Sequence, residues 1–192
     1  MHSKPLSFRI AVFASGSGSN LESLISAEKE KFFSSKIALV VSNKKEAYAL
    51  ERAKNHNIKT YLEEGENELL LKLQEEKIDL IVLAGYLKIL GKNLLDSYKG
   101  RIINIHPSLL PKFGGKGMYG IHVHEAVFAA KEKRSGASVH FVTEEIDGGE
   151  IILQASLNIE PLNSPKEIQE AVLILEHQAL KTAIKLCEEV YN

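Results

Sequence analysis

The chain has 192 residues, of which 44% are hydrophobic and 26% charged, and its net charge is −1 at pH 7. This composition is typical of a globular protein with a sizeable core, and the near-zero charge disfavours a nucleic-acid or anionic-membrane surface. We therefore expect one domain over residues 1–192, with neither nucleic acid nor membrane as a partner.

Short apolar runs alternate along the chain with segments that have the apolar spacing of helices. The expected strands are 9–15, 37–43, 79–86 and 101–106, and two more lie within 137–159. The expected helices are 20–32, 45–57, 67–77, 124–134 and 163–191. The start of the last helix is signalled by Ser164 as N-cap, by Pro165, and by Glu167, which completes a capping box.

Strands that alternate with helices predict an α/β fold. We expect an open, twisted, mostly parallel sheet of the Rossmann-like kind, with helices on both faces. The last two strands have no helix between them, so they should form an antiparallel pair at one edge. In such sheets ligands bind beyond the carboxyl ends of the strands. The candidate site therefore comprises SGSGSN (15–20), LAGYLK (83–88), NIHPS (104–108) and EEIDGG (144–149).

The glycine-rich turn SGSGSN follows a strand and opens a helix, so its backbone N–H groups can bind an anion. The dinucleotide fingerprint fails twice. Its third glycine would fall at Leu21, and Ser42 and Asn43 stand where an acid should bind the ribose. A single phosphate bound near Ser19 and Asn20 is the better functional interpretation, and a tight turn without a ligand is the alternative.

Asn104 and His106 lie two residues apart at the end of an expected strand, so they share one face. Pro107 stiffens the exit of that strand. Asp147 lies in a loop near the same rim, and a carboxylate beside an imidazole favours the charged imidazole. The three groups suit acyl transfer to an amine: the amide and imidazole stabilise the oxyanion, and the acid helps move the amine proton. The alternatives are a structural histidine and an ordinary Asp-Gly hairpin turn.

Three further histidines and one cysteine need an interpretation. His122 and His124 form an H-x-H pair and His140 adds a third imidazole, but neither a cysteine pair nor H-E-x-x-H accompanies them. We expect no metal site, and structural or supporting roles for these rings. Cys187 is the only cysteine and falls within the last helical pattern. It is expected in the core, and a chain without disulfides is expected in the cytoplasm.

The N-terminal stretch MHSKPLSFRI lacks the apolar segment of a signal peptide. No run approaches the roughly 18 apolar residues that a membrane helix needs. We therefore expect neither a secretory leader nor a membrane anchor.

Several segments resemble the phosphoribosylglycinamide formyltransferase family, in order and over nearly the whole chain. They are GSGSN, VVSNKKEAYALERA, DLIVLAGYLKIL, INIHPSLLPKFGG, SVHFVTEEIDGGEIILQ and LEHQAL. The resemblance implies the formyltransferase fold and the transfer of a formyl group from 10-formyltetrahydrofolate, as cosubstrate, to the amine of glycinamide ribonucleotide in de novo purine biosynthesis. It implies no metal, and we expect a monomer or a weak homodimer.

The resemblance also implies a role for individual residues. The catalytic residues would be Asn104, His106 and Asp147; the glycinamide ribonucleotide site would use Gly18, Ser19, Asn20 and Glu176; and the folate site would use Leu87, Lys88, Ile89, Leu90, Thr143, Glu144, Glu145 and Ile146. Lys88 stands where relatives often have arginine. Lysine can bind the folate glutamate carboxylate, but it lacks the planar arrangement of N–H donors with which arginine binds a carboxylate.

Three alternatives stay open. The first is a related enzyme that hydrolyses the same folate. The second is a phosphate-binding domain without catalytic activity, in which the strand end at residues 104–106 takes part in no reaction. The third is a nicotinamide dehydrogenase, which Leu21 and Ser42 disfavour.

Overall fold

The computed structural model describes residues 8–191. Residues 1–7, which form most of the stretch considered above as a signal segment, lie outside the described residues, as does residue 192. The strands are β1 (Arg9–Phe13), β2 (Lys36–Ser42), β3 (Lys59–Leu62), β4 (Leu80–Leu83), β5 (Ile102–His106), β6 (Arg134–Phe141) and β7 (Ile151–Asn158). The helices are α1 (Ser19–Lys29), α2 (Tyr48–Asn55), α3 (Glu66–Glu75), α4 (Lys92–Ser97), α5 (Ile121–Ala129) and α6 (Pro165–Tyr191).

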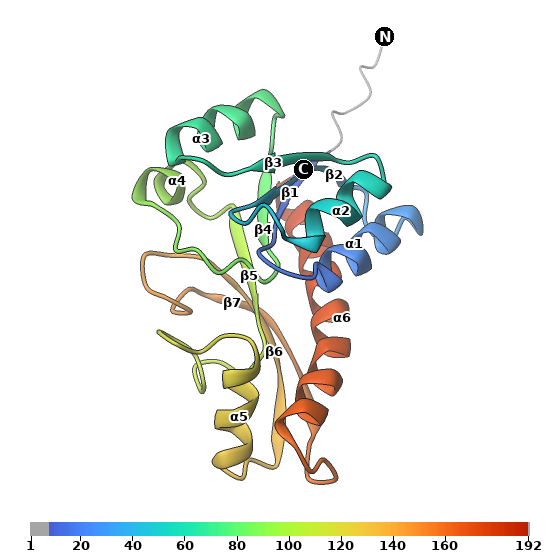
Figure 1. The fold of residues 1–192 in the computed structure, drawn as a ribbon, viewed down its shortest axis with the longest axis vertical. Helices are drawn as coiled ribbons and strands as arrows, with labels where there is room; N and C mark the ends of the chain where they lie inside the picture. Colours follow the sequence, from blue (N-terminus) through green and yellow to red (C-terminus); the bar gives the residue numbers. More distant parts are fainter. Residues whose placement is uncertain (1–7, 192) are drawn as a thin grey trace.

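The seven strands form one sheet in the order β3-β2-β1-β4-β5-β6-β7 (Figure 1). The pairs from β3 to β5 are parallel, and β5–β6 and β6–β7 are antiparallel. The predicted α/β class, with a mostly parallel sheet and an antiparallel pair at one edge, is confirmed.

Both faces of the sheet are covered by helices because side chains alternate along each strand. In β1, Ile10 and Val12 belong to the apolar cluster that contains side chains of α1, α2, α5 and α6. Ala11 and Phe13 point the other way, into the cluster with α3 and α4. Figure 1 shows α3 and α4 on one side of the sheet and α1, α2 and α6 on the other. The predicted two-faced packing is confirmed.

Three features of the fold differ from the prediction. The strand β3 and the helix α4 were not predicted, because four and six residues are too short to show a period. The helix α5 begins three residues before the predicted 124–134 and ends at Ala129. It ends there because Lys131 has a positive φ of 52°, a left-handed conformation that stops a helix, and the chain then enters β6. The loop between β6 and β7 is longer than the two-residue turn that Asp-Gly suggests.

The helix α6 begins where the sequence predicts. The Glu167 N–H donates to Ser164 Oγ over 3.2 Å, and the Glu167 carboxylate accepts from the Asn163 N–H over 2.9 Å.

Cys187 is buried in the core as expected, and burial raises the pKa of its thiol to about 11. Among the helices that the structure describes, none combines the length and apolar character needed to span a bilayer.

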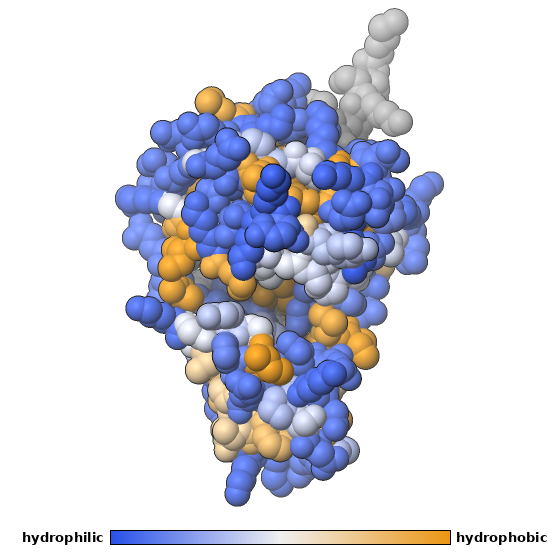
Figure 2. Space-filling model, in the orientation of Figure 1, coloured by the Kyte–Doolittle hydropathy of each residue, from blue (hydrophilic) through white to orange (hydrophobic). Residues whose placement is uncertain are grey.

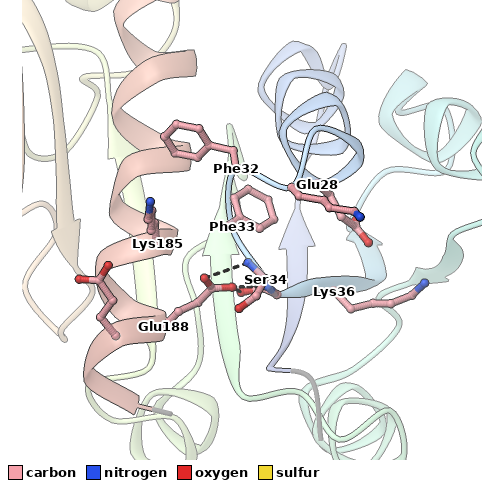
Figure 3. A pocket seen from close by; sticks show the side chains of 10 residues that line it. Glu28, Phe32, Phe33, Ser34, Lys36, Lys185 and Glu188 are labelled. Carbon is pink, nitrogen blue, oxygen red and sulfur yellow. Dashed lines mark hydrogen bonds between the residues drawn. The ribbon is translucent and has the colours of Figure 1, made fainter. Parts of the chain in front are cut away.

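The end of α6 is fixed to the segment before β2 by the buried side chain of Glu188 (Figure 3). Its carboxylate accepts hydrogen bonds from the Ser34 N–H over 3.0 Å and from the N–H and Oγ of Ser35. An open cavity of about 800 Å³ lies beside this contact and is lined in part by Phe32 and Lys185. It lies near the start of β2, at the edge of the sheet opposite the carboxyl ends of the strands.

Replacement of Glu188 by alanine is expected to lower the free energy of unfolding by about 2–3 kcal/mol, because buried donors lose a charged acceptor. Urea unfolding at pH 7 measures this change. The exposed neighbour Glu189 provides the matched control, since its replacement by alanine should change the free energy by no more than about 0.5 kcal/mol. Equal effects of the two substitutions would show that the contact with Ser34 and Ser35 contributes nothing.

Candidate active site

The candidate site lies at the carboxyl ends of β1, β4 and β5, where parallel strands bring their following loops together. Figure 2 shows a recess in this face of the molecule with hydrophobic surface beside it. The loops after β4 and β6 expose large apolar side chains: Leu87 is 52%, Ile89 75% and Ile146 44% exposed. Exposed apolar groups beside buried polar ones are typical of a ligand site.

Asn104 is held by a histidine on the neighbouring strand. The two residues are directly paired in the β5–β6 register, and Asn104 Nδ2 lies 3.1 Å from His140 Nε2. His140 Nδ1 lies 2.8 Å from the Phe141 carbonyl oxygen, which can only accept, so Nδ1 carries the proton and Nε2 accepts from the amide. Since an amide has two N–H groups, one donor of Asn104 is not used by His140.

His106 lies at the end of the same strand with its ring almost fully shielded from solvent. Its Nε2 donates to the Phe113 carbonyl over 2.8 Å, which leaves Nδ1 facing Asp147 Oδ2 at 3.5 Å. Burial lowers the pKa of His106 below 6.5, although the charge of Asp147 and the hydrogen bond to Phe113 act against that shift. The imidazole is therefore neutral at pH 7. The predicted preference for imidazolium is wrong here because the cost of burying the charge exceeds the attraction of Asp147.

Asp147 is the third residue of this group and lies in the loop between β6 and β7. Its Oδ2 accepts from the Gly115 N–H over 2.9 Å, and its Oδ1 lies 3.5 Å from His140 Nε2. Burial alone would raise the pKa of Asp147, but the contact with the His140 ring and the hydrogen bond from the Gly115 N–H lower it below 3.8. The carboxylate is thus ionised at neutral pH. The structure brings Asn104, His106 and Asp147 together.

The H-x-H pair is split between solvent and core. His122 is exposed and lies 3.1 Å from the Glu125 carboxylate. His124 is buried, and burial lowers its pKa to about 4. Within residues 8–191, no three or more His, Cys, Asp or Glu side chains lie close enough together to hold a metal ion.

The glycine-rich turn and Glu176 lie side by side although 156 positions separate Asn20 from Glu176. Asn20 Nδ2 donates to Glu176 Oε2 over 2.8 Å, and the buried Asn20 Oδ1 has no partner in the structure. Burial raises the pKa of the Glu176 carboxyl, and the bond from Asn20 offsets only part of that shift. Gly18 has a φ of 71°, and a Cβ there would lie 2.8 Å from the Cα of Ala49, so this position requires glycine.

The turn after β4 and the loop after β6 form two rims of the recess. Ser15 holds the turn: its Oγ accepts from the Leu87 N–H over 2.9 Å, and its own N–H donates to the Gly85 carbonyl over 3.0 Å. An ion pair of 2.6 Å between Lys92 and Glu144 joins the two rims. The segment 143–146 therefore contacts the start of α4, which lies just after the segment 87–90.

Sequence reasoning gave no role of their own to several residues that support this site, although Ser15 lies within the predicted segment 15–20. Ser15, Phe113 and Gly115 act through a hydroxyl or a backbone group, which no side-chain pattern marks. Glu63 is the fourth, and it contacts Tyr86 and Lys88 in the turn after β4. It follows the unpredicted strand β3 and stands in an acidic stretch, which gave no reason to single it out.

Comparisons with known proteins identify the family. A model described as formyl transferase matches residues 8–184. The chain is 40% identical to the phosphoribosylglycinamide formyltransferase of Haemophilus influenzae, over 92% of this chain and 85% of that protein. It is 36% identical to the chloroplastic phosphoribosylglycinamide formyltransferase of Arabidopsis thaliana, over 97% of this chain and 68% of that protein.

A solved structure agrees with these relatives. The crystal structure of glycinamide ribonucleotide transformylase 1 from Symbiobacterium toebii superposes with a TM-score of 0.90 and is 31% identical in sequence. The match covers 98% of this chain and 91% of that one. The chain therefore belongs to the formyl transferase family, and within it to the phosphoribosylglycinamide formyltransferases.

Proposed function

We propose that the chain transfers the formyl group of 10-formyltetrahydrofolate to the amine of glycinamide ribonucleotide, and that Asn104, His106 and Asp147 carry the chemistry. The observation that supports this best is their grouping at the carboxyl end of β5, around the His140 ring. The named activity of the relatives agrees with it. The group contains a free amide donor, a neutral imidazole and an ionised carboxylate.

The reaction moves one proton besides the formyl group. The acceptor amine attacks the formyl carbon, and the carbonyl oxygen gains negative charge that the remaining N–H of Asn104 stabilises. The nitrogen of the attacking amine becomes positively charged and gives a proton to the pair of His106 and Asp147. A proton held at His106 Nδ1 adds a second donor near the oxyanion. The pair then returns the proton to the nitrogen that leaves, so the enzyme ends unchanged.

The acceptor side of the site is the turn before α1 together with α6. The free N–H groups of Ser19 and Asn20, in the first turn of α1, suit a phosphate, because a helix N-terminus favours an anion. Glu176 suits the ribose hydroxyls, and the unpartnered Asn20 Oδ1 accepts one more donor. A substitution at Gly18 would disturb the packing against Ala49, so it cannot test the phosphate site cleanly.

The donor side is formed by the two rims. The exposed side chains of Leu87, Ile89 and Ile146 fit the apolar ring system of a folate. The backbone of residues 87–90 and 143–146 would bind its polar edge, although the Leu87 N–H already donates to Ser15. When bound, the folate supplies the activated formyl group. The exposed apolar side chains of the two rims thus fit the cosubstrate.

An assay of folate absorbance, with and without glycinamide ribonucleotide, tests the proposed function. We expect the deformylated folate to form only when the acceptor is present, together with formylated product. Release of formate without the acceptor would instead identify a hydrolase. Binding of both ligands without turnover would identify a binding domain.

Replacement of Glu176 by glutamine is expected to raise the KM for glycinamide ribonucleotide about tenfold or more, since a hydrogen bond to a charged group contributes about 1.5–3 kcal/mol. The kcat and the melting temperature should change little, because glutamine still accepts from Asn20. Steady-state kinetics measure the change. The exposed Glu170 on the same helix is the matched control, and equal KM values for the two variants would remove Glu176 from the site.

A further inference from the structure

The side chain of Glu63 lies under the donor-side turn and is almost fully buried, with only 4% of its surface exposed. One carboxylate oxygen accepts from the Tyr86 hydroxyl over 2.8 Å, and the other accepts from Lys88 Nζ over 2.5 Å. Burial, and then the neighbouring Glu63, raise the pKa of Tyr86, so its phenol stays protonated and donates. Glu63 thus binds the turn at two residues that flank Leu87.

The same turn is also held by Ser15, which bonds to the backbone of Gly85 and Leu87. The ring of Tyr86 packs edge-on against Phe13, with centroids 5.2 Å apart. The backbone is therefore fixed, while the side chains of Leu87 and Ile89 stay exposed. Of the groups that hold this turn, Glu63 is the one that also forms an ion pair with it, through Lys88.

The ion pair with Glu63 changes what Lys88 can do. The Lys88 side chain is 51% exposed, so a ligand can reach it, but its ammonium faces a carboxylate that water screens poorly. A buried carboxylate without a partner is costly, so the pair resists being opened. Glu63 and Lys88 together carry no net charge, so an anionic ligand that approaches Lys88 gains little electrostatic attraction.

We propose that Glu63 is a positioning residue for the donor-side turn, and that it withholds the charge of Lys88 from the anionic glutamate tail of the folate. This inference rests on the proposed function, which places the folate on this turn. It predicts that the chain distinguishes poorly between folates with one glutamate and folates with several. Recognition of the folate then depends on the apolar side chains and the backbone of the two rims.

The test is the dissociation constant for tetrahydrofolate with one or three glutamates, measured by calorimetry at low salt. The wild-type protein should bind the two forms within about twofold of each other. Glu63→Gln frees the ammonium of Lys88, so the triglutamate form should be favoured about fivefold, the effect of one unscreened charge pair near a surface. That preference should disappear at 0.5 M salt and in the double variant Glu63→Gln/Lys88→Gln.

Two controls separate charge from position. Glu64→Gln removes an exposed charge next to Glu63 and should behave like the wild type. Glu63→Ala removes the acceptor of Tyr86 as well, so it should weaken binding of the monoglutamate form severalfold, whereas Glu63→Gln keeps one acceptor and should largely preserve it. The KM for glycinamide ribonucleotide should be unchanged in Glu63→Gln.

Two results would overturn the inference. One is a wild-type preference for the triglutamate form that Lys88→Gln abolishes, because the charge of Lys88 would then be available. The other is an unchanged preference in Glu63→Gln with monoglutamate binding equal in Glu63→Gln and Glu63→Ala. Failure of the proposed function is a separate result, because it would appear as folate binding without formyl transfer in the wild-type protein.

Discussion

Replacement of Asn104 by alanine is expected to lower kcat by about 10²–10³, the usual cost of removing one oxyanion donor. His140 Nε2 uses one amide hydrogen of Asn104, so the other is the one lost to the reaction. Because the oxygen becomes negative only as the bond forms, kcat and kcat/KM should fall together while ligand affinities stay close to normal.

Steady-state kinetics with both substrates, accompanied by thermal unfolding, separate this role from a structural one. The loss of the bond to His140 should cost about 1 kcal/mol of stability, which leaves the variant folded. A variant with near-normal kcat and lowered stability would show that Asn104 serves only to hold His140.

The sequence predicts the architecture of the site because its determinants are local. The loops after β1, β4 and β5 follow parallel strands, which place them at one edge of the sheet. The loop with Asp147 instead follows β6, which is antiparallel to β5. The antiparallel pair at the edge of the sheet was predicted from two apolar segments with no helix between them, and the start of α6 from Ser164. The order of the strands in the sheet was not predicted. The family resemblance implied that Asn20 and Glu176 belong to one substrate site, but their direct contact was not predicted, because no spacing rule connects residues on α1 and α6.

The protonation state of His106 could not be predicted from the sequence because it depends on burial in the folded protein. The sequence places Asp147 near His106 and so suggests a charged ring, yet the ring is enclosed by Phe113 and the surrounding core. The role of His140 likewise depends on register, since only the pairing of β5 with β6 sets it opposite Asn104. Glu63 follows a four-residue strand that carries too little pattern to be predicted.

The pair of His106 and Asp147 is expected to act as one proton-holding unit. His106→Ala and Asp147→Asn should each lower kcat by about 10²–10⁴, the usual contribution of a positioned acid or base. The double variant should be little worse than the worse single variant, because either loss already disables the unit. Losses that multiply would show that the two side chains act independently.

The pH dependence of the Asp147→Asn variant has a definite sign. Activity of the wild-type enzyme should fall as pH drops through the pKa of His106, which burial holds below 6.5, because the ring is then already protonated and cannot take up the amine proton. The charge of Asp147 raises that pKa, so its removal should move the acid limb of the kcat profile to lower pH. The exposed Glu150, replaced by glutamine, is the control and should leave the limb in place. An unchanged limb in Asp147→Asn, or a shift to higher pH, would mean that Asp147 does not act on the His106 ring and that its contact with Gly115 serves only to hold the loop.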